Sequence, residues 1–194
     1  MHENEINDIK LNQPKSSLKT RRVLREIFSW FMWIGGAVAF AVIVNSAVIV
    51  NAKVISGSME QTIMTGDRIV GSRMSYLFRD PDRFDVIVFR WPDNPQELPF
   101  VKRIIGLPGE TVEIIQGRVY IDNALIPLDE AAHLAEDMRG NYGPFFVPEG
   151  AFFVLGDNRG NSEDSRSWQN QFVPRENILG KVILRIHPHF GPIR

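Results

Sequence analysis

The chain of 194 residues contains no cysteine. That absence excludes disulfide bonds, thiolate metal sites and a cysteine nucleophile. Histidine is scarce, and His2, His133, His187 and His189 show no spacing typical of a metal site, so we expect no bound metal. The chain also lacks a large net charge, because its 22 Lys+Arg are balanced by 23 Asp+Glu. We therefore expect no nucleic-acid partner.

Lysine is rare beyond residue 50, where three lysines stand against thirteen arginines. Lys102 lies in an apolar segment and, if this is a strand, shares a face with Phe100 and Ile104. Burial would lower its pKa and make it a candidate general base, which arginine cannot be. The alternative is an edge-strand lysine that extends to water. Lys181 is a second candidate base, and Lys53 borders an apolar segment.

That apolar segment, Ile27–Val50, is the one long run without a charged side chain. As a helix its 24 residues span about 36 Å, enough for a bilayer core. Basic residues precede it, so residues 1–26 are expected to be a cytoplasmic basic tail, with the first twenty disordered, and residues 51–194 to lie outside. We favour an uncleaved anchor over a cleaved signal peptide, although small residues such as Ala47 would suit cleavage.

Beyond the apolar segment the sequence predicts a mostly β domain, because short runs rich in Val, Ile and Phe are bounded by Gly, Pro, Asp and Asn. The expected strands are Arg68–Ser72, Asp85–Phe89, Phe100–Ile105, Thr111–Ile115, Arg118–Ile121, Phe152–Leu155 and Gly180–Ile186. Asp122-Asn123 predicts a hairpin turn leading into a strand at Leu125-Ile126. Residues 128–142 are expected to form a short helix or a loop insertion.

Two polar segments could carry chemistry. Ser56-Gly57-Ser58-Met59 is either a solvated turn or a turn that presents a serine nucleophile, which would need a base. Gly156–Arg166 is dense in Asn, Asp, Ser and Gly, and Asp157, Asp164 and Arg166 are expected to form a salt-bridged brace. A calcium loop is the alternative, but the EF-hand ligand pattern is absent.

Four segments together resemble the bacterial type I signal peptidases, which are membrane-bound endopeptidases with a Ser/Lys pair. The segments are Ser56–Ile63, Gly66–Val70, Lys102–Glu110 and Gly156–Arg166. They occur in the family's order after one apolar N-terminal segment, and the short insert between the last two is similar to the Gram-positive form. Each match is weak alone, whereas the ordered set is specific.

The resemblance implies that Ser58 is the nucleophile and Lys102 the general base. Ser56 and the Ser58 N–H would form the oxyanion hole, and Ser162 would orient the Lys102 amine. The residues expected to brace the structure are Arg103, Asp157, Asp164 and Arg166, and those expected to line pockets for small residues one and three positions before the cut are Ile55, Met59, Phe100 and Val101. Neither a metal nor a cofactor is needed.

The family fold implied is a β catalytic domain preceded by one transmembrane helix, with residues 111–150 as a small β extension. The implied partners are precursor proteins that carry signal peptides and the lipid bilayer, and the implied location is the cell membrane, in a single pass. Ile55 and Gln61 depart from the family, which usually has proline at both positions. The loss of these prolines would affect rate or preference rather than mechanism.

Three other functions stay open from the residues alone. One is a hydrolase with His133, His187 or His189 as the base. The second is a repressor-like protease that cleaves its own chain, which the apolar segment and the lack of a DNA-binding segment disfavour. The third is a membrane-anchored binding module without activity. Replacement of Ser58 by alanine distinguishes the binding module from an enzyme.

Overall fold

The computed structural model describes residues 15–91, 93, 98–129, 138–188 and 190–193. It divides into two units, residues 1–44 and 45–194, and each is described by itself. The mostly β fold expected from the sequence is confirmed for the second unit, which holds every described strand.

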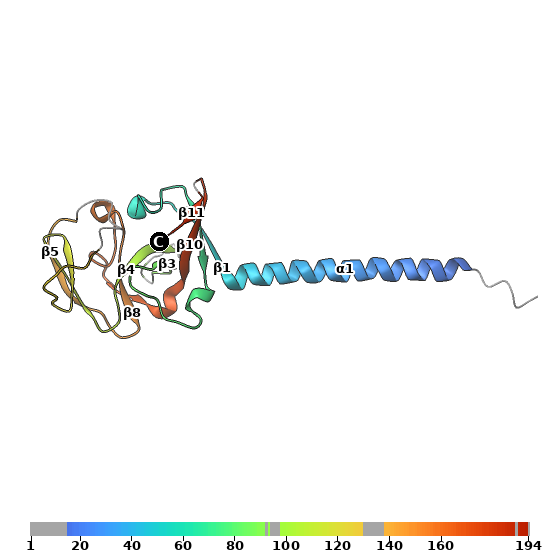
Figure 1. The fold of residues 1–194 in the computed structure, drawn as a ribbon, viewed down its shortest axis with the longest axis horizontal. Coiled ribbons are helices and arrows are strands. Elements are labelled where there is room, and N and C mark those ends of the chain that lie inside the picture. The colour runs from blue at the N-terminus through green and yellow to red at the C-terminus, as the bar shows by residue number, and fades with distance from the viewer. Residues whose placement is uncertain (1–14, 92, 94–97, 130–137, 189, 194) are drawn as a thin grey trace, which may run out of the picture. The chain divides into compact units, whose positions relative to one another are not determined.

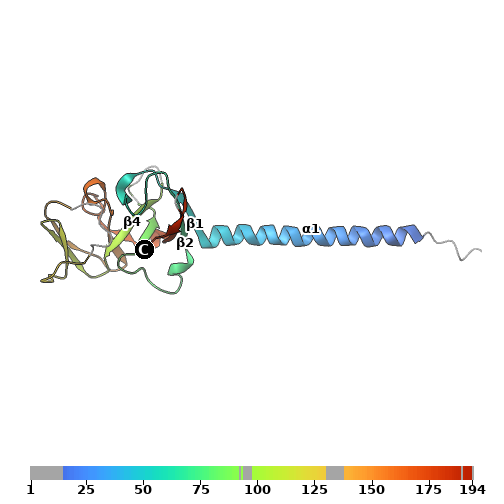
Figure 2. The ribbon, with the colours of Figure 1, turned by 45° about the horizontal axis from the view of Figure 1, so that its top comes forward.

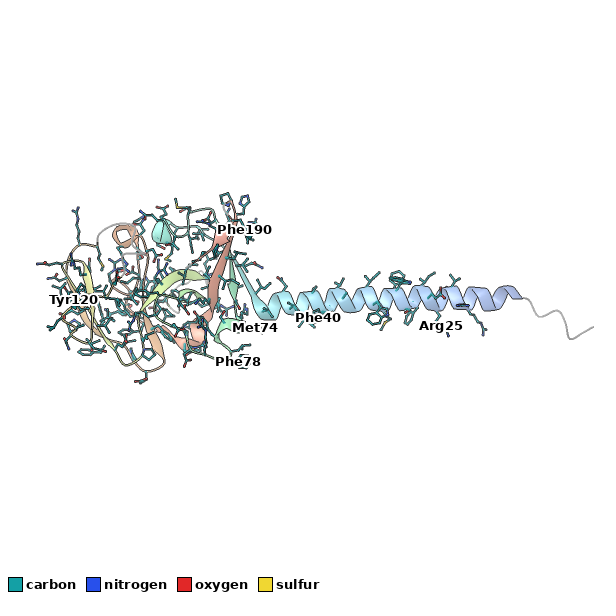
Figure 3. The ribbon with its side chains drawn as sticks, in the orientation of Figure 1. Arg25, Phe40, Met74, Phe78, Tyr120 and Phe190 are labelled. Carbon is teal, nitrogen blue, oxygen red and sulfur yellow. The ribbon has the colours of Figure 1, made fainter. Side chains whose placement is uncertain are left out.

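Helix α1 (Lys15–Val48) is 34 residues long and contains no proline, the residue that would break it. The segment Arg21–Asn45 of this helix is apolar and long enough to cross a membrane. Its 25 residues would extend about 38 Å. The side chains of Arg25 and Phe40 project from this helix (Figure 3). By length and composition, the helix suits a membrane anchor.

Both ends of the predicted apolar helix need correction. The helix begins at Lys15, so the end of the segment predicted to be disordered is helical, while residues 1–14 lie outside the described part. It ends at Val48, and Ile49 and Val50 belong to strand β1 (Ile49–Lys53). Valine and isoleucine favour strands, and here they pair with β2 (Arg68–Ser72).

The larger sheet has eight strands within the described residues, in the order β1-β2-β10-β3-β4-β8-β9, with β11 paired to β10. Its remaining strands are β3 (Val86–Phe89), β4 (Phe100–Gly106), β8 (Ala151–Leu155), β9 (Val173–Pro174), β10 (Ile178–His187) and β11 (Gly191–Pro192). Every pairing is antiparallel. The sheet is curled, with β4 in its interior and β1 and β2 toward one end (Figure 2).

A smaller sheet has the order β6-β5-β7, formed by β5 (Thr111–Ile115), β6 (Arg118–Ile121) and β7 (Tyr142–Phe146). The β5–β6 hairpin turns at Gln116 and Gly117, whose φ values of 51° and 79° are those of a two-residue hairpin loop. The sheet lies to one side of the larger one (Figure 1).

The predicted hairpin at Asp122-Asn123 is wrong. Both residues have positive φ and form a turn, but the chain after them makes no strand, and Leu125 and Ile126 are exposed. The Asp122 side chain instead accepts a hydrogen bond from the Thr111 N–H at 2.8 Å. The turn therefore closes back on β5. Of the predicted insertion at 128–142, residues 130–137 lie outside the described part, and Tyr142 begins β7.

The core of the larger sheet holds in place the segments that carry the predicted site. Val86 and Val88 of β3 pack with Met59 and Ile63, which are fully buried, in one cluster. Met59 is the last residue of a short turn, η1 (Gly57–Met59), and Ile63 follows it, so two buried side chains anchor the chain at the end of this turn and just beyond it. Burying such side chains contributes about 1.5–3 kcal/mol each. The turn contacts β4 and η3 (Arg159–Asn161) and is drawn in teal in Figure 1.

Candidate active site

The turn at η1 brings two serine hydroxyls together. The Oγ atoms of Ser56 and Ser58 lie 3.3 Å apart, and Ser58 is only 8% exposed. A Cβ at Gly57 between them would lie 2.7 Å from the Glu60 carboxylate, so a side chain there would require the flexible Glu60 side chain to move. Gln61, just beyond, has φ of 78°, which the ring of a proline cannot adopt. The glutamine in place of the family's proline is therefore consistent with the backbone of this turn.

Lys102 is 2% exposed and lies on β4, an interior strand paired with β3 on one side and β8 on the other. The alternative of an edge-strand lysine extending to water is therefore excluded. Within the described part of the chain, its ammonium has no hydrogen bond and no ion pair closer than 4 Å. Burial, opposed by the more distant Asp164 carboxylate, lowers the pKa of Lys102 from 10.5 to about 8.

Arg103, the next residue, points to the other face of β4 and is fully buried. Its guanidinium binds both oxygens of Asp157, at 2.8 Å through Nε and 2.7 Å through Nη2, and Nη1 donates to the Phe84 carbonyl at 2.7 Å. Asp157 also accepts a hydrogen bond from the Thr62 hydroxyl at 2.5 Å. This brace joins the lysine strand, the serine turn and the acidic loop.

The rest of the acidic loop is braced around Asp164, as the sequence predicted. Arg166 donates to both Asp164 oxygens, at 2.7 and 2.8 Å, and to the Arg159 carbonyl at 2.9 Å. The Gly156 N–H donates to Asp164 at 3.1 Å. These carboxylates are occupied by arginine and amide donors, which disfavours the calcium-loop alternative.

A cleft of about 440 Å³ is lined by Ser56, Ser58, Lys102 and Ser162, together with Glu163. We call it the dyad cleft. The structure thus brings together all four residues predicted to carry chemistry. The Ser162 Oγ is buried and has no hydrogen-bond partner within the described residues, so its predicted bond to the Lys102 amine is not formed here.

A second pocket of about 220 Å³ adjoins the dyad cleft and shares Ser56, Ser58 and Lys102 with it. All four predicted pocket residues line it, namely Ile55, Met59, Phe100 and Val101. We call it the apolar pocket. Ile55 stands exposed, whereas Met59 is fully buried and also belongs to the core. The pocket is small, which suits small side chains.

The rival bases are less suited. The Lys181 ammonium is paired with the Asp85 carboxylate, and Lys53 is exposed. His187 is exposed at the end of β10, while His133 and His189 lie outside the described residues. No group of three or more metal-ligating side chains occurs in the described part of the chain, and the expectation of a metal-free site stays a prediction.

Three neighbours of the site were not predicted. Asn158 donates from its backbone N–H to the Ser58 carbonyl and from Nδ2 to the Gly57 carbonyl, both at 3.1 Å. Thr62 joins the brace, and Glu163 lines the dyad cleft. Asn158 and Glu163 lie in a loop that is rich in polar residues, and this composition alone does not indicate which side chain reaches the turn.

Gly156 allows the acidic loop to approach the serine turn. A Cβ at this position would lie 2.2 Å from the Ser162 Oγ and 2.4 Å from the Ser58 carbonyl oxygen. No side chain fits between groups so close, so glycine is required by this contact. The loop and the turn are thereby held in contact at Ser58.

The site therefore has the groups that a serine hydrolase with a lysine base would need: a hydroxyl, a buried amine without a partner in the described residues, a cleft that both line, and a small apolar pocket. The chain itself belongs to the signal peptidase family, peptidase S26, whose family model matches residues 27–187. This family consists of peptidases, and the resemblance drawn from the sequence is confirmed.

Curated relatives agree with this assignment, and one solved structure is also similar to the chain. A probable signal peptidase I-2 from Synechocystis sp. is 40% identical over 156 residues, which cover 78% of this chain and 69% of that protein. A signal peptidase I from Leptolyngbya laminosa is 40% identical over 161 residues, covering 80% and 77%. The crystal structure of a signal peptidase I from Enterococcus faecalis V583 is 36% identical, with a TM-score of 0.43 over 53% of this chain and 97% of that one.

Proposed function

We propose that this chain removes N-terminal signal peptides from exported precursor proteins by serine endopeptidase chemistry, with Ser58 as the nucleophile and Lys102 as the general base. The observation that carries the assignment of residues is the buried, unpaired Lys102 amine in a cleft shared with Ser58. With a pKa near 8, about one tenth of this lysine is uncharged at pH 7 and about half at pH 8.

In the first step the Ser58 oxygen attacks the scissile carbonyl, and its proton passes to Lys102. The negative oxygen of the tetrahedral intermediate is stabilised by the Ser56 hydroxyl and the Ser58 N–H, and the loss of one such donor typically costs about 3–4 kcal/mol. Lys102 then gives its proton to the leaving amine, and the C–N bond breaks. A water molecule, deprotonated by Lys102, hydrolyses the resulting ester.

Ser162 is proposed to orient the amine. Its Oγ is buried in the wall of the dyad cleft, which Lys102 also lines, and it has no partner within the described residues, so it is available to bond to the amine. Catalytic hydrogen bonds often tighten only when substrate is bound. No cofactor takes part in any step.

The apolar pocket is proposed to select small residues one and three positions before the cut. Its volume of about 220 Å³ and its lining by Ile55, Met59, Phe100 and Val101 favour small apolar side chains over large or charged ones. Ser58 borders the pocket, which supports a cut at the edge of the pocket.

The apolar part of helix α1 is proposed to anchor the enzyme in the membrane, with the basic N-terminal tail in the cytoplasm and the catalytic domain, which begins at β1, on the extracytoplasmic face. The basic residues before the apolar segment support this orientation. Within the catalytic domain, residues 111–150 are proposed as a small β extension. Confining enzyme and precursor to one membrane raises their effective concentration.

The test is cleavage of a precursor with alanine one and three positions before the cut, by the full chain purified in detergent. Wild type should release the mature protein at that bond, as read by N-terminal sequencing, and Ser58→Ala and Lys102→Ala should not. Ser75→Ala, a serine in η2 (Met74–Tyr76) away from the cleft, is the matched control and should cleave normally. Cleavage by folded Ser58→Ala would contradict the proposal. Cleavage by Lys102→Ala would show that Lys102 is not the general base.

A further inference from the structure

Asn158 holds the serine turn at two successive carbonyl groups. Its Nδ2 donates to the Gly57 carbonyl and its backbone N–H to the Ser58 carbonyl, each at 3.1 Å. The contact with Gly57 joins positions 101 residues apart. The Gly57 carbonyl also accepts from the Glu60 N–H at 3.1 Å, so two donors fix its direction.

A fixed Gly57 carbonyl fixes the Ser58 N–H as well. The two groups belong to one planar trans peptide, and in such a peptide they point in opposite directions. Two donors hold the carbonyl on the side of the acidic loop and of Glu60, so the N–H points away from both. The Ser58 N–H has no acceptor within the described part of the chain. It is therefore available to donate a hydrogen bond to a substrate oxygen.

The Asn158 amide is used only at its donor end. Nδ2 faces two acceptors, the Gly57 carbonyl at 3.1 Å and the Glu60 carboxylate at 3.4 Å, and this sets which end of the amide is nitrogen. Its Oδ1 is buried without a partner in the described residues. A buried unpaired oxygen is unfavourable, so stability alone would favour a different side chain here.

We infer that Asn158 is a positioning residue, whose Nδ2–H···O=C bond to Gly57 aims the Ser58 N–H at the oxyanion of the reaction. The inference rests on the proposed function, because it concerns the same oxyanion hole. Asn158 itself touches neither the substrate nor the reacting atoms. Its effect is confined to states in which the substrate oxygen carries negative charge.

The first experiment compares wild type with Asn158→Ala and Asn158→Ser, both too short to reach the Gly57 carbonyl, in the full chain. Because one of two donors to that carbonyl is lost, kcat should fall by about 10–100-fold while KM changes less than about twofold. The pH at which the acid side of the profile bends should not move, because the surroundings of Lys102 are unchanged. Asn170→Ala, which removes an exposed asparagine bonded to Asp93, is the matched control and should leave kcat unchanged.

The second experiment separates aiming from folding. A peptide aldehyde that ends in alanine accepts the Ser58 oxygen at its carbonyl carbon, and the hydroxyl proton passes to Lys102, so an oxyanion forms. The corresponding peptide alcohol fills the same pocket without forming one. Asn158→Ala should weaken binding of the aldehyde by at least about tenfold and of the alcohol by less than about twofold.

The ratio of the two affinities does not depend on how much of the variant is folded, so partial unfolding cannot hide the result. Equal weakening of both ligands, or no weakening of the aldehyde, would overturn the inference. Failure of the proposed function looks different, because wild type would then cleave no precursor and bind the aldehyde no better than Ser58→Ala does.

Discussion

Lys102 and Arg103 are neighbours on β4, both cationic and both buried, yet their surroundings are opposite. Arg103 faces a carboxylate and a carbonyl that use its Nε and both Nη atoms. Lys102, on the other face, has no such partner in the described residues and lines a cleft. On one strand, therefore, the Arg103 guanidinium is paired with a carboxylate, while the neighbouring Lys102 amine is buried without an ion pair and has a lowered pKa.

The difference between Arg103 and Lys102 follows from the chemistry of their side chains. An arginine cannot be deprotonated in practice, so burying it requires a partner, and the Arg103–Asp157 pair joins β4 to the acidic loop. A lysine can be buried without a partner because it can give up its proton. The face with the ion pair holds the site together, and the face with Lys102 carries the proposed base.

The largest effect is expected for Lys102→Met, which keeps the shape of the side chain but removes the amine. Cleavage should fall by about 10²–10⁴-fold because the base is lost. Stability should rise, since a pKa lowered from 10.5 to about 8 corresponds to about 3 kcal/mol against folding when the lysine is protonated.

The pH dependence of that gain follows from the sign of the shift. The folded pKa of Lys102 lies below the unfolded value, so wild type is destabilised in full below about pH 8 and recovers as the pH rises toward 10.5. The gain of Lys102→Met in urea unfolding should therefore be full at pH 7 and shrink above pH 8. A variant that is less stable than wild type at pH 7 would contradict the comparison.

The opposite result is expected for Arg103→Met. It leaves the Asp157 carboxylate buried without its cation, which costs about 3–5 kcal/mol. Urea unfolding measures this loss, and activity should fall in step with the folded fraction. Arg118→Met, an exposed arginine on β6, is the control and should change stability by less than about 0.5 kcal/mol.

The rate of cleavage should follow the protonation of Lys102. Below the pKa of about 8, kcat/KM should fall about tenfold for each pH unit, because only the neutral amine accepts the Ser58 proton, and it should level off above that pKa. Initial rates between pH 6 and 10, with folding checked at each pH, measure this. A flat profile across that range would argue against a titrating base.

The smallest effect is expected for Glu163→Gln. Burial lowers the pKa of Lys102 most, while carboxylates including that of Glu163 raise it. Removing this exposed charge should shift the acid side of the rate profile down by less than about one pH unit, and by less still at high salt. Glu176→Gln, exposed on η4 (Arg175–Asn177), should leave the profile in place. A shift of the acid side of the profile to higher pH would contradict the statement that the Glu163 charge raises the pKa of Lys102.

Much of the larger sheet was predictable because its strands are short apolar runs between breakers. The alternation along β4 also assigned Lys102 and Arg103 to opposite faces, which the register confirms. Strand β1 was missed because Val48, Ile49 and Val50 continue the apolar helix without a polar boundary. Strand β7 was missed because Gly143 and Pro144 read as breakers within it.

The remaining misses concern pairing over distance. Asp122-Asn123 and Gln116-Gly117 both place positive φ values at a turn, and sequence alone does not say which turn is followed by a strand. Asn158 could not be singled out because its loop contains several similar polar residues, and its partner lies 101 residues earlier. Such contacts follow from the folded sheet, not from local pattern.

The most direct test is the titration of the Lys102 side chain itself. In the full chain with ¹³C-labelled lysine, the Cε signal of Lys102 is assigned by its absence in Lys102→Met and followed by NMR from pH 6 to 11. A midpoint near pH 8, well below those of the other lysines, is the predicted result. A midpoint near 10.5 would mean that the amine is charged at neutral pH, and Lys102 could not then act as the base.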